Sequence, residues 1–310
     1  MAWCHITLRP VDGGQRYSRE GLRQIHPRLK SLEAIDLSHE EQLRQARLRA
    51  DKMSVQGVQP KLSAALRVSK GRFDVVDRGG RFILKPNPPP FEEVPANEAL
   101  TMALAAVSGI EVPPHGLVPG SDGRWVYFVR RFDREGRDQR LPLEDFAQLS
   151  GATCDTKYSS SLERVADLVE TFCTFPALER PKLAQRLLFC FLTGNEDMHL
   201  KNFSVLSRDG VVALAPAYDL LNTTLVLEKA PEETALPLDG KKRKLTRELW
   251  IDYFCRERLS LSGRQVDSIS DQLSDRLPLW REFIDRSFLS PPRKRAYREL
   301  IDARAKRLGL

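Results

Sequence analysis

The sequence predicts an α+β protein in which a small β-rich lobe precedes a larger, mainly helical lobe. Short runs with high β propensity, separated by glycine-containing turns, fill the chain between residues 62 and 132. From residue 161 onward, apolar residues recur mainly at helical spacing. At 310 residues the chain is long enough for two lobes, each with its own core. We expect an N-terminal extension over residues 1–53, the β-rich lobe over 54–135 and the helical lobe over 136–310.

The N-terminal extension carries few clear signals of secondary structure. We expect a short strand at Cys4–Leu8, followed by a loop and polar sequence. Ser38 and Glu41 have the spacing of a capping box, in which each residue satisfies a backbone N–H of the other. This pair predicts the start of a charged helix that runs to about Lys52.

The β-rich lobe is predicted to contain one helix among its strands. Turn signals at residues 69–71 and 78–80 separate the first three strands and favour an antiparallel meander. Apolar residues from Leu100 to Val107 fall at helical spacing, and Gly109 ends that helix. The expected strands are Leu62–Val68, Phe73–Val76, Arg81–Leu84, Val112–Val118 and Trp125–Phe132.

The helical lobe begins with two helices that are apolar on one face. Gly194 follows the second of them as a C-terminal cap. A strand pair then turns at Arg208-Asp209-Gly210, because Asp-Gly favours a tight hairpin. The expected helices cover 161–174, 182–192, 246–254, 264–273, 275–287 and 292–308, and the expected strands cover 203–206 and 211–214.

The composition is that of an ordinary soluble globular protein, with 41% apolar and 29% charged residues. No apolar run approaches the roughly 18 residues of a membrane span, and the N-terminus has no signal-peptide pattern. The five cysteines are scattered and include no C-x-x-C pair, which argues against a disulfide framework or a zinc site. We expect a cytoplasmic protein without a membrane partner.

The net charge of +7 is a modest excess that permits an acidic partner such as nucleic acid. The densest basic run is Lys241–Lys244. It is either a solvated loop or a weak DNA contact, and the sequence does not distinguish the two.

The most informative pattern lies between residues 194 and 219. Asp197 precedes Asn202 by five residues, and Asp219 follows after a short strand. This order is typical of protein-kinase-like phosphotransferases, in which one carboxylate accepts the proton of the acceptor hydroxyl while an amide and a second carboxylate hold a metal. Asp197 is therefore the candidate base, and Asn202 and Asp219 are candidate ligands for Mg²⁺. His199 either faces the phosphates or is a structural histidine.

A nucleotide-binding half is predicted upstream of this pattern. Lys85 ends an apolar strand, where its ammonium can reach the phosphates, and Glu98 opens the next helix in position to pair with it. Gly57 lies in Ser54–Lys61, where it allows the main chain to fold over phosphates, although an ordinary turn also fits. Neither a Walker A loop nor G-x-G-x-x-G is present.

Together these motifs resemble the HipA-like serine/threonine kinases of bacterial toxin–antitoxin systems, from about residue 50 to the C-terminus. Besides the stretches above, the resemblance includes Val129–Arg134 and Leu236–Lys242. It implies a two-lobed protein-kinase-like fold that uses ATP and Mg²⁺, with Asp197 as the base. The residues that it places around the nucleotide are Gln56, Gly57, Val58, Gln59, Pro60, Lys61, Lys85, Glu98, Arg130, Arg131, Phe132, His199, Leu200, Lys201, Asn202, Tyr218 and Asp219.

The resemblance also implies a biological role. Such kinases phosphorylate aminoacyl-tRNA synthetases, pair with a HipB-like DNA-binding antitoxin and carry an autophosphorylated serine, here Ser54. Only 53 residues precede Ser54, so the chain is similar to the short HipT variety, whose N-terminal subdomain is a separate HipS-like protein. HipT proteins can carry two serines in this loop, whereas here residue 56 is Gln56.

Two other functions remain open at this point. A small-molecule kinase of the aminoglycoside-phosphotransferase type shares the D-x4-N pattern. Those enzymes usually have a histidine two residues before the aspartate, where this chain has Asn195. A DNA-binding co-repressor module without catalysis is the second alternative, supported by the basic run at Lys241–Lys244.

Overall fold

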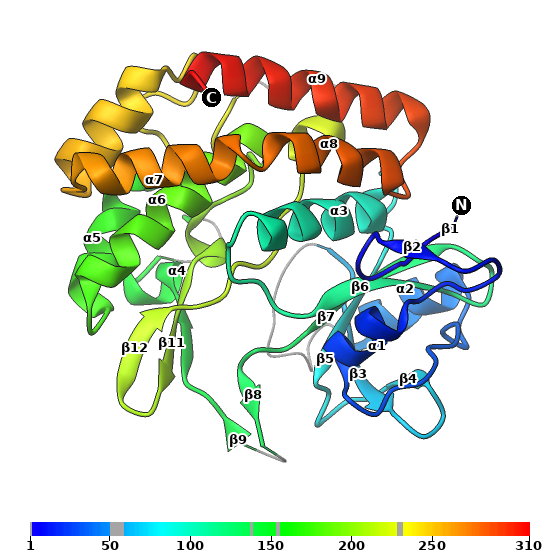
Figure 1. The fold of residues 1–310 in the computed structure, drawn as a ribbon. Helices are drawn as coiled ribbons and strands as arrows, with labels where there is room; N and C mark the ends of the chain where they lie inside the picture. The colour runs from blue at the N-terminus through cyan, green and yellow to red at the C-terminus, as the bar shows by residue number, and fades with distance from the viewer. Residues whose placement is uncertain (1, 50–58, 137–138, 153–155, 228–231) are drawn as a thin grey trace. The chain divides into compact units, whose positions relative to one another are not determined.

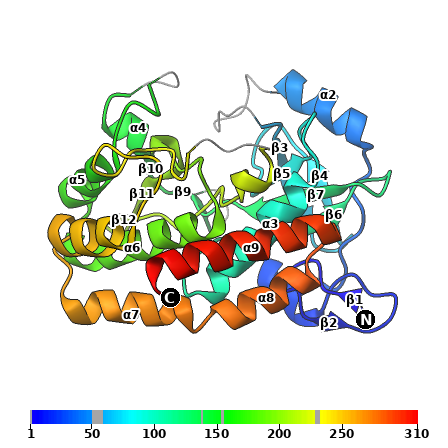
Figure 2. The same ribbon diagram turned by 90° about the horizontal axis from the view of Figure 1, so that it is seen from above.

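The computed structural model describes residues 2–49, 59–136, 139–152, 156–227 and 232–310 (Figures 1 and 2). Its contacts divide the chain into two compact units. The first, here the sheet unit, comprises Met1–Ala103, Pro113–Asp138 and Phe283–Ser290. The second, here the helical unit, comprises Leu104–Val112, Gln139–Glu282 and Pro291–Leu310. The prediction of mixed α and β structure is confirmed.

An antiparallel five-stranded sheet forms the centre of the sheet unit, in the order β4-β3-β5-β7-β6 (Figure 1). The meander expected for the first three strands is wrong, because β5 pairs with β3 and β4 lies at the edge. Strand β6 begins three residues later than the sequence suggested, because Pro113 and Pro114 have no N–H to donate to a neighbouring strand. The strands are β3 (Leu62–Arg67), β4 (Arg72–Val75), β5 (Phe82–Pro86), β6 (His115–Pro119) and β7 (Trp125–Arg130); α3 (Val94–Val107) follows β5.

The strand expected at Cys4–Leu8 is wrong. Residues 4–8 form a turn instead, in which Leu8 N donates to Cys4 O at 3.0 Å and Leu8 takes a left-handed φ of 54°. The turn joins two short strands, β1 (Ala2–Trp3) and β2 (Pro10–Val11), which pair antiparallel. Apolar alternation over five residues fits a strand and a tight turn equally well, so it did not separate them.

Two helices follow in the N-terminal segment. The first, α1 (Arg19–Ile25), was not predicted; Ser18 caps it by accepting from Gly21 N. The second, α2 (His39–Arg49), starts where predicted, and Ser38 Oγ accepts from Glu41 N at 3.3 Å. Glu41 binds Arg44 and Gln45 with its carboxylate. The expected continuation to Lys52 lies outside the described residues.

One hydrophobic core joins this N-terminal segment to the sheet. Phe73 lies at the centre of an aromatic cluster, with its ring centroid 5.0 Å from that of Phe82 and 5.2 Å from that of Phe128. Leu22 and Ile25 of α1 belong to the same buried cluster. The N-terminal segment therefore supplies apolar side chains that help to bury the sheet.

In the helical unit, α6 packs against α5, α7 and α9 (Figure 2). It starts six residues earlier than predicted and contains Pro181 within its first two turns. The α-helices of the helical unit are α4 (Phe146–Leu149), α5 (Leu162–Phe172), α6 (Pro176–Thr193), α7 (Gly263–Ser274), α8 (Leu277–Arg286, whose last residues belong to the sheet unit) and α9 (Pro291–Leu308). Glu248–Arg258, expected as an α-helix over 246–254, winds as a π-helix. Within the described residues, no helix is both long and apolar enough to cross a bilayer.

A three-stranded antiparallel sheet flanks these helices, in the order β10-β11-β12. The hairpin of β11 (Ser204–Arg208) and β12 (Val211–Leu214) is confirmed. Asp209 and Gly210 have φ of 50° and 79°, as a type I′ turn requires. The third strand, β10 (Leu143–Asp145), is too short to be evident from sequence.

Gly194 ends α6 as predicted. Its φ of 73° is left-handed, and Asn195 N donates to Cys190 O at 2.9 Å, which completes a Schellman-type cap. A Cβ at this position would lie 2.5 Å from Leu300 Cδ2 and 2.8 Å from Thr224 Oγ1. Glycine is therefore required both by conformation and by space.

We predict that Gly194→Ala lowers the apparent free energy of unfolding by about 2–4 kcal/mol, measured by urea titration, because strain and overpacking add. Gly210→Ala is the matched control: its φ is 79°, but a Cβ there meets nothing within 4 Å. It should cost only about 1 kcal/mol. Equal losses for the two variants would contradict the packing argument.

Candidate active site

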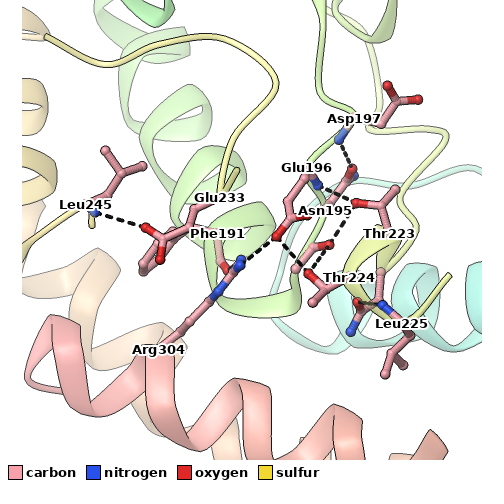
Figure 3. A network of polar contacts seen from close by, with 12 residues as sticks. Phe191, Asn195, Glu196, Asp197, Thr223, Thr224, Leu225, Glu233, Leu245 and Arg304 are labelled. Carbon is pink, nitrogen blue, oxygen red and sulfur yellow. Dashed lines mark hydrogen bonds and ion pairs between the residues drawn. The ribbon is translucent and has the colours of Figure 1, made fainter. Parts of the chain in front are cut away.

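The catalytic segment, defined here as residues 194–202, connects α6 to β11 in the helical unit. Its own side chains fold it: Asn195 Oδ1 accepts from Asp197 N at 3.2 Å, and Asn202 Nδ2 donates to Asp197 O at 2.7 Å. A 3₁₀ turn, Leu200–Asn202, closes the segment. These bonds fix the main chain of Asp197, while its carboxylate stays about half exposed, at 51%. Figure 3 shows that carboxylate pointing away from the polar network beneath it.

Two aromatic side chains lie beside the Asp197 carboxylate. Tyr158 donates its hydroxyl to Asp197 Oδ1 at 2.6 Å, and His199 Nε2 lies 3.9 Å from the same oxygen. The rings of Tyr158 and His199 meet edge to face, with centroids 4.9 Å apart. Burial lowers the pKa of His199, and the Asp197 carboxylate only partly opposes that shift. His199 is therefore a buried, mostly neutral neighbour of Asp197 near pH 7.

Asn202 is oriented by its bond to Asp197. A main-chain carbonyl can only accept, so the amide nitrogen of Asn202 must face it and the amide oxygen is turned the other way. An amide oxygen is a suitable ligand for Mg²⁺. Asn202 is only 8% exposed, which limits its rotation.

Asp219 is brought beside the catalytic segment by its neighbour Tyr218. The Tyr218 hydroxyl lies 2.5 Å from Ser204 Oγ and donates to Lys201 O at 3.0 Å. Burial raises the pKa of the Tyr218 hydroxyl, so it stays protonated and able to donate. Asp219 itself takes a left-handed φ of 54°, a conformation that aspartate adopts more readily than most residues with a side chain.

A buried arginine that the sequence did not reveal supports the segment that follows β12 and leads to Asp219. Arg186 projects from α6, is 4% exposed, and donates through Nη2 to Ala215 O at 2.8 Å. Burial lowers the pKa of its guanidinium. Arg186 falls on the buried side of an apolar helix, where sequence periodicity leads one to expect a hydrophobic residue.

A second arginine clamps the catalytic segment from α9 (Figure 3). Arg304 donates through Nη2 to Glu196 Oε1 at 2.7 Å and through Nη1 to Phe191 O at 2.6 Å. The same Glu196 oxygen accepts from Thr224 Oγ1 at 2.8 Å, while Thr223 Oγ1 accepts from Glu196 N at 2.7 Å. The residue next to Asp197 is thus fixed through both its side chain and its main chain. Arg304 lies 108 residues from Glu196, and no sequence signal links them.

Two predicted nucleotide contacts in this segment are already engaged within the protein. The Lys201 ammonium pairs with Asp145 at 3.1 Å, and Asp145 also caps α4 by accepting from Gln148 N. Leu200 is 2% exposed, so its side chain belongs to the core. A nucleotide contact at Leu200 would therefore use main-chain atoms.

In the sheet unit, Lys85 and Glu98 form the pair that the sequence suggested. Lys85 Nζ donates to Glu98 Oε1 at 2.5 Å, and each side chain is 3% exposed. Lys85 Nζ also lies 5.5 Å from the ring centroid of Tyr127. A buried charge pair of this kind orients both partners, since separating them would leave an uncompensated buried charge.

The stretch from Arg130 to Phe132 begins at the last residue of β7. Arg130 N and Arg131 N donate to Pro114 O and Arg81 O, each at 2.8 Å, so neither is available to a base. Any contact with adenine would use other main-chain atoms of this stretch.

The carboxyl of Asp133, just after this stretch, is held by two arginines. Burial alone would raise its pKa, but two hydrogen bonds from Arg131 and the charge of Arg134 outweigh that effect, and the pKa is lowered.

The predicted phosphate loop is described only at its end. Ser54, Gln56, Gly57 and Val58 lie outside the described residues. Gln59, Pro60 and Lys61 lead directly into β3, and the Gln59 amide nitrogen is buried without a hydrogen-bond partner among the described residues. A buried donor of this kind calls for an acceptor, which a phosphate oxygen can supply.

Comparison with known proteins shows which family the chain belongs to. Residues 53–280 match the HipA-like C-terminal domain. The chain belongs to the HipA-like family. A Haemophilus influenzae relative named as a kinase is 28% identical over 242 residues, which cover 72% of this chain and 69% of that protein. The serine/threonine-protein kinase toxin HipA of Shewanella oneidensis is 29% identical over 210 residues, 61% of this chain and 47% of the toxin. The HipA-like chain thus spans about half the length of that toxin.

Solved structures share the fold. Shewanella oneidensis HipA, in a complex with HipB and operator DNA, superposes with a TM-score of 0.69 at 24% identity, covering 83% of this chain and 66% of HipA. The Helicobacter pylori proinflammatory kinase CtkA superposes with a TM-score of 0.56 at 16% identity, covering 76% and 88%. At these identities the likeness establishes a kinase-like fold and nothing finer.

We predict that Arg304→Met lowers the apparent free energy of unfolding by about 3 kcal/mol, because it leaves the Glu196 carboxylate buried without its cation. Arg281→Met is the matched control. Arg281 pairs with Asp302, which lies on α9 as Arg304 does, but both side chains of this pair are about half exposed. The control should lose less than about 1 kcal/mol. Urea unfolding measures both.

The Arg304→Met defect should also depend on pH. Burial raises the pKa of Glu196 even with Arg304 in place, and removing the cation raises it further. A raised carboxyl pKa means that the folded state binds the proton more tightly, so stability is regained as pH falls through that pKa. We therefore expect the deficit relative to wild type to shrink between pH 8 and pH 5. A deficit that stays constant would show that Glu196 is not the residue left uncompensated.

Proposed function

We propose that this HipA-like protein is an ATP-dependent serine/threonine protein kinase and the toxin of a bacterial toxin–antitoxin system. The main support for this proposal is the geometry of Asp197. Hydrogen bonds within the catalytic segment fix its main chain, and its carboxylate is about half exposed. A carboxylate in this setting can orient an incoming hydroxyl and accept its proton, for which geometry matters more than basicity. Membership of a family whose curated members are named as kinases gives independent support.

Asn202 and Asp219 fit the role of Mg²⁺ ligands. The first presents an amide oxygen because its nitrogen is bound to Asp197 O, and the second is an anionic oxygen donor beside the same segment. Both are hard ligands of the type that Mg²⁺ prefers, usually with water and phosphate oxygens completing the shell. When bound, the metal would neutralise charge on the phosphates.

Lys85 and the loop before β3 fit the role of phosphate binders. The bond to Glu98 fixes the Lys85 ammonium, so little side-chain entropy remains to be lost when a phosphate binds. Gln59 adds a buried donor that lacks a partner among the described residues. Gln56, Gly57, Val58, Pro60 and Lys61 complete this proposed loop by the family resemblance.

The biological role extends the proposal beyond the site. We propose an aminoacyl-tRNA synthetase as the protein substrate, which places the kinase in the cytoplasm, and Ser54 as an autophosphorylation site. Shewanella HipA is found with HipB and operator DNA, which supports a HipB-like antitoxin here. A HipS-like partner stays a prediction. A direct DNA contact at Lys241–Lys244 has less support, because Lys241 and Lys242 already pair with Asp239 and Glu232.

We predict that Asp197→Asn lowers phosphate transfer by on the order of 10²–10⁴-fold, because the amide cannot take the acceptor's proton. The assay is transfer from γ-labelled ATP to proteins of a bacterial lysate, with peptide mapping for phosphoserine at Ser54. Nucleotide binding should persist, and ATP with Mg²⁺ at 100 times Kd should add about 2.7 kcal/mol of stability to both proteins.

The outcomes separate the candidate functions. Label in protein bands that disappears with Asp197→Asn supports the protein kinase. Label only in small molecules would support the aminoglycoside-phosphotransferase type. Absence of any stabilisation by ATP and Mg²⁺ would contradict both kinases and leave the co-repressor module.

A further inference from the structure

Tyr158 makes the shortest contact to the candidate base, yet no motif includes it. Its hydroxyl donates to Asp197 Oδ1 at 2.6 Å, the length of a strong hydrogen bond between a hydroxyl and a carboxylate. Burial raises the pKa of Tyr158, and the bond to Asp197 raises it further, so the phenol keeps its proton throughout the physiological range. The donor is therefore permanent.

The contact is built from several directions. The rings of Tyr158 and buried His199 meet edge to face, and Lys157 Nζ lies 4.9 Å from the centroid of the Tyr158 ring. The preceding main chain is also tied to the catalytic segment, because Leu200 N donates to Lys157 O at 3.4 Å. Although 43% exposed, the tyrosine is thus positioned by its backbone, its ring and its hydroxyl.

Tyr158 and His199 both approach the same oxygen of the carboxylate. They lie 2.6 and 3.9 Å from Oδ1, whereas Oδ2 has no hydrogen bond or ion pair among the described residues. A carboxylate with one oxygen held cannot rotate freely about its terminal torsion, so its second oxygen keeps a fixed direction. Orientation of the accepting atom is the property on which proton transfer depends.

We propose that Tyr158 is a positioning residue for phosphate transfer: its hydroxyl holds Oδ1 of Asp197 so that Oδ2 is the oxygen that receives the acceptor's proton. The inference rests on the proposed kinase function. In the step, the acceptor oxygen bonds to the γ-phosphorus of ATP, the bond from that phosphorus to the bridging oxygen breaks, and ADP leaves with that electron pair. The acceptor's proton passes to Oδ2.

A competing role for Tyr158 would have the opposite effect on the rate of phosphate transfer. If the Tyr158 hydroxyl instead occupied the place of the acceptor hydroxyl, removing it would expose the base and speed the reaction. If Tyr158 were itself an acceptor, it would carry phosphate after incubation with ATP. The same variant, Tyr158→Phe, distinguishes these possibilities because it removes only the hydroxyl.

The experiment measures kcat and KM for ATP, using transfer from γ-labelled ATP to bacterial lysate proteins, together with the melting temperature and a peptide map of residue 158. Tyr253→Phe is the matched control, since Tyr253 donates to the carboxylate of Glu163 at 3.2 Å elsewhere in the helical unit. We expect Tyr158→Phe to lower kcat about 10-fold, the effect of losing one hydrogen bond to a charged group, with KM for ATP unchanged. The control should match wild type.

Several results would overturn the inference. They are an unchanged or raised kcat in Tyr158→Phe, a fall in kcat matched by a lower melting temperature and a higher KM for ATP, and phosphate on Tyr158 of the wild-type protein. In each of these the wild type still transfers phosphate, so the proposed function survives. Failure of the wild type to transfer any phosphate would instead overturn the proposed function and the inference with it.

Discussion

A buried ion pair between Glu196 and Arg304 holds the peptide that carries the candidate base. The side chains are 7% and 5% exposed, and the arginine also binds the last turn of α6 through Phe191 O. One guanidinium therefore joins the end of a helix, the residue next to Asp197 and helix α9. Rigid support of this kind suits a weak base, because a carboxylate contributes to proton transfer mainly by being correctly placed. The left-handed Gly194 makes the arrangement possible by turning the chain sharply at the end of α6.

The residues around Asp197 divide into those that hold the main chain and those that face outward. Arg186 and Tyr218 bind main-chain carbonyls, and Arg186 is buried, so its role is to set the position of the main chain. Asp197, Asn202 and Asp219 carry the oxygen atoms suited to a hydroxyl or a metal. The supporting groups are nearly all long-range contacts, whereas the three oxygen-bearing residues lie close together in sequence. This difference explains why a short motif could suggest the chemistry but not the residues that support it.

Periodicity and turn chemistry predicted much of the fold. Alternation and glycine turns located the strands of the sheet unit, and Asp209-Gly210 located the β11–β12 hairpin, because these signals are local. The strand predicted at Cys4–Leu8 was wrong, because an apolar pattern over five residues does not distinguish a strand from a turn. The pairing of Lys85 with Glu98 was predictable from a strand-end lysine and a helix-start carboxylate. Tyr158 and Arg304 were not, since each reaches its partner across a distance in sequence that only the tertiary fold closes.

We propose that the catalytic segment and Asp219 form a site for metal-bound nucleotide. The direct test is Mn²⁺ binding in the presence of ATP, followed by electron paramagnetic resonance, for wild type and Asp219→Asn. Asparagine tolerates the left-handed backbone of residue 219, so the substitution removes a charge without adding strain. We expect nucleotide-dependent Mn²⁺ binding in the wild type that weakens at least about 10-fold in the variant, because an anionic ligand is lost. Equal Mn²⁺ affinity in the two proteins would rule out Asp219 as a metal ligand.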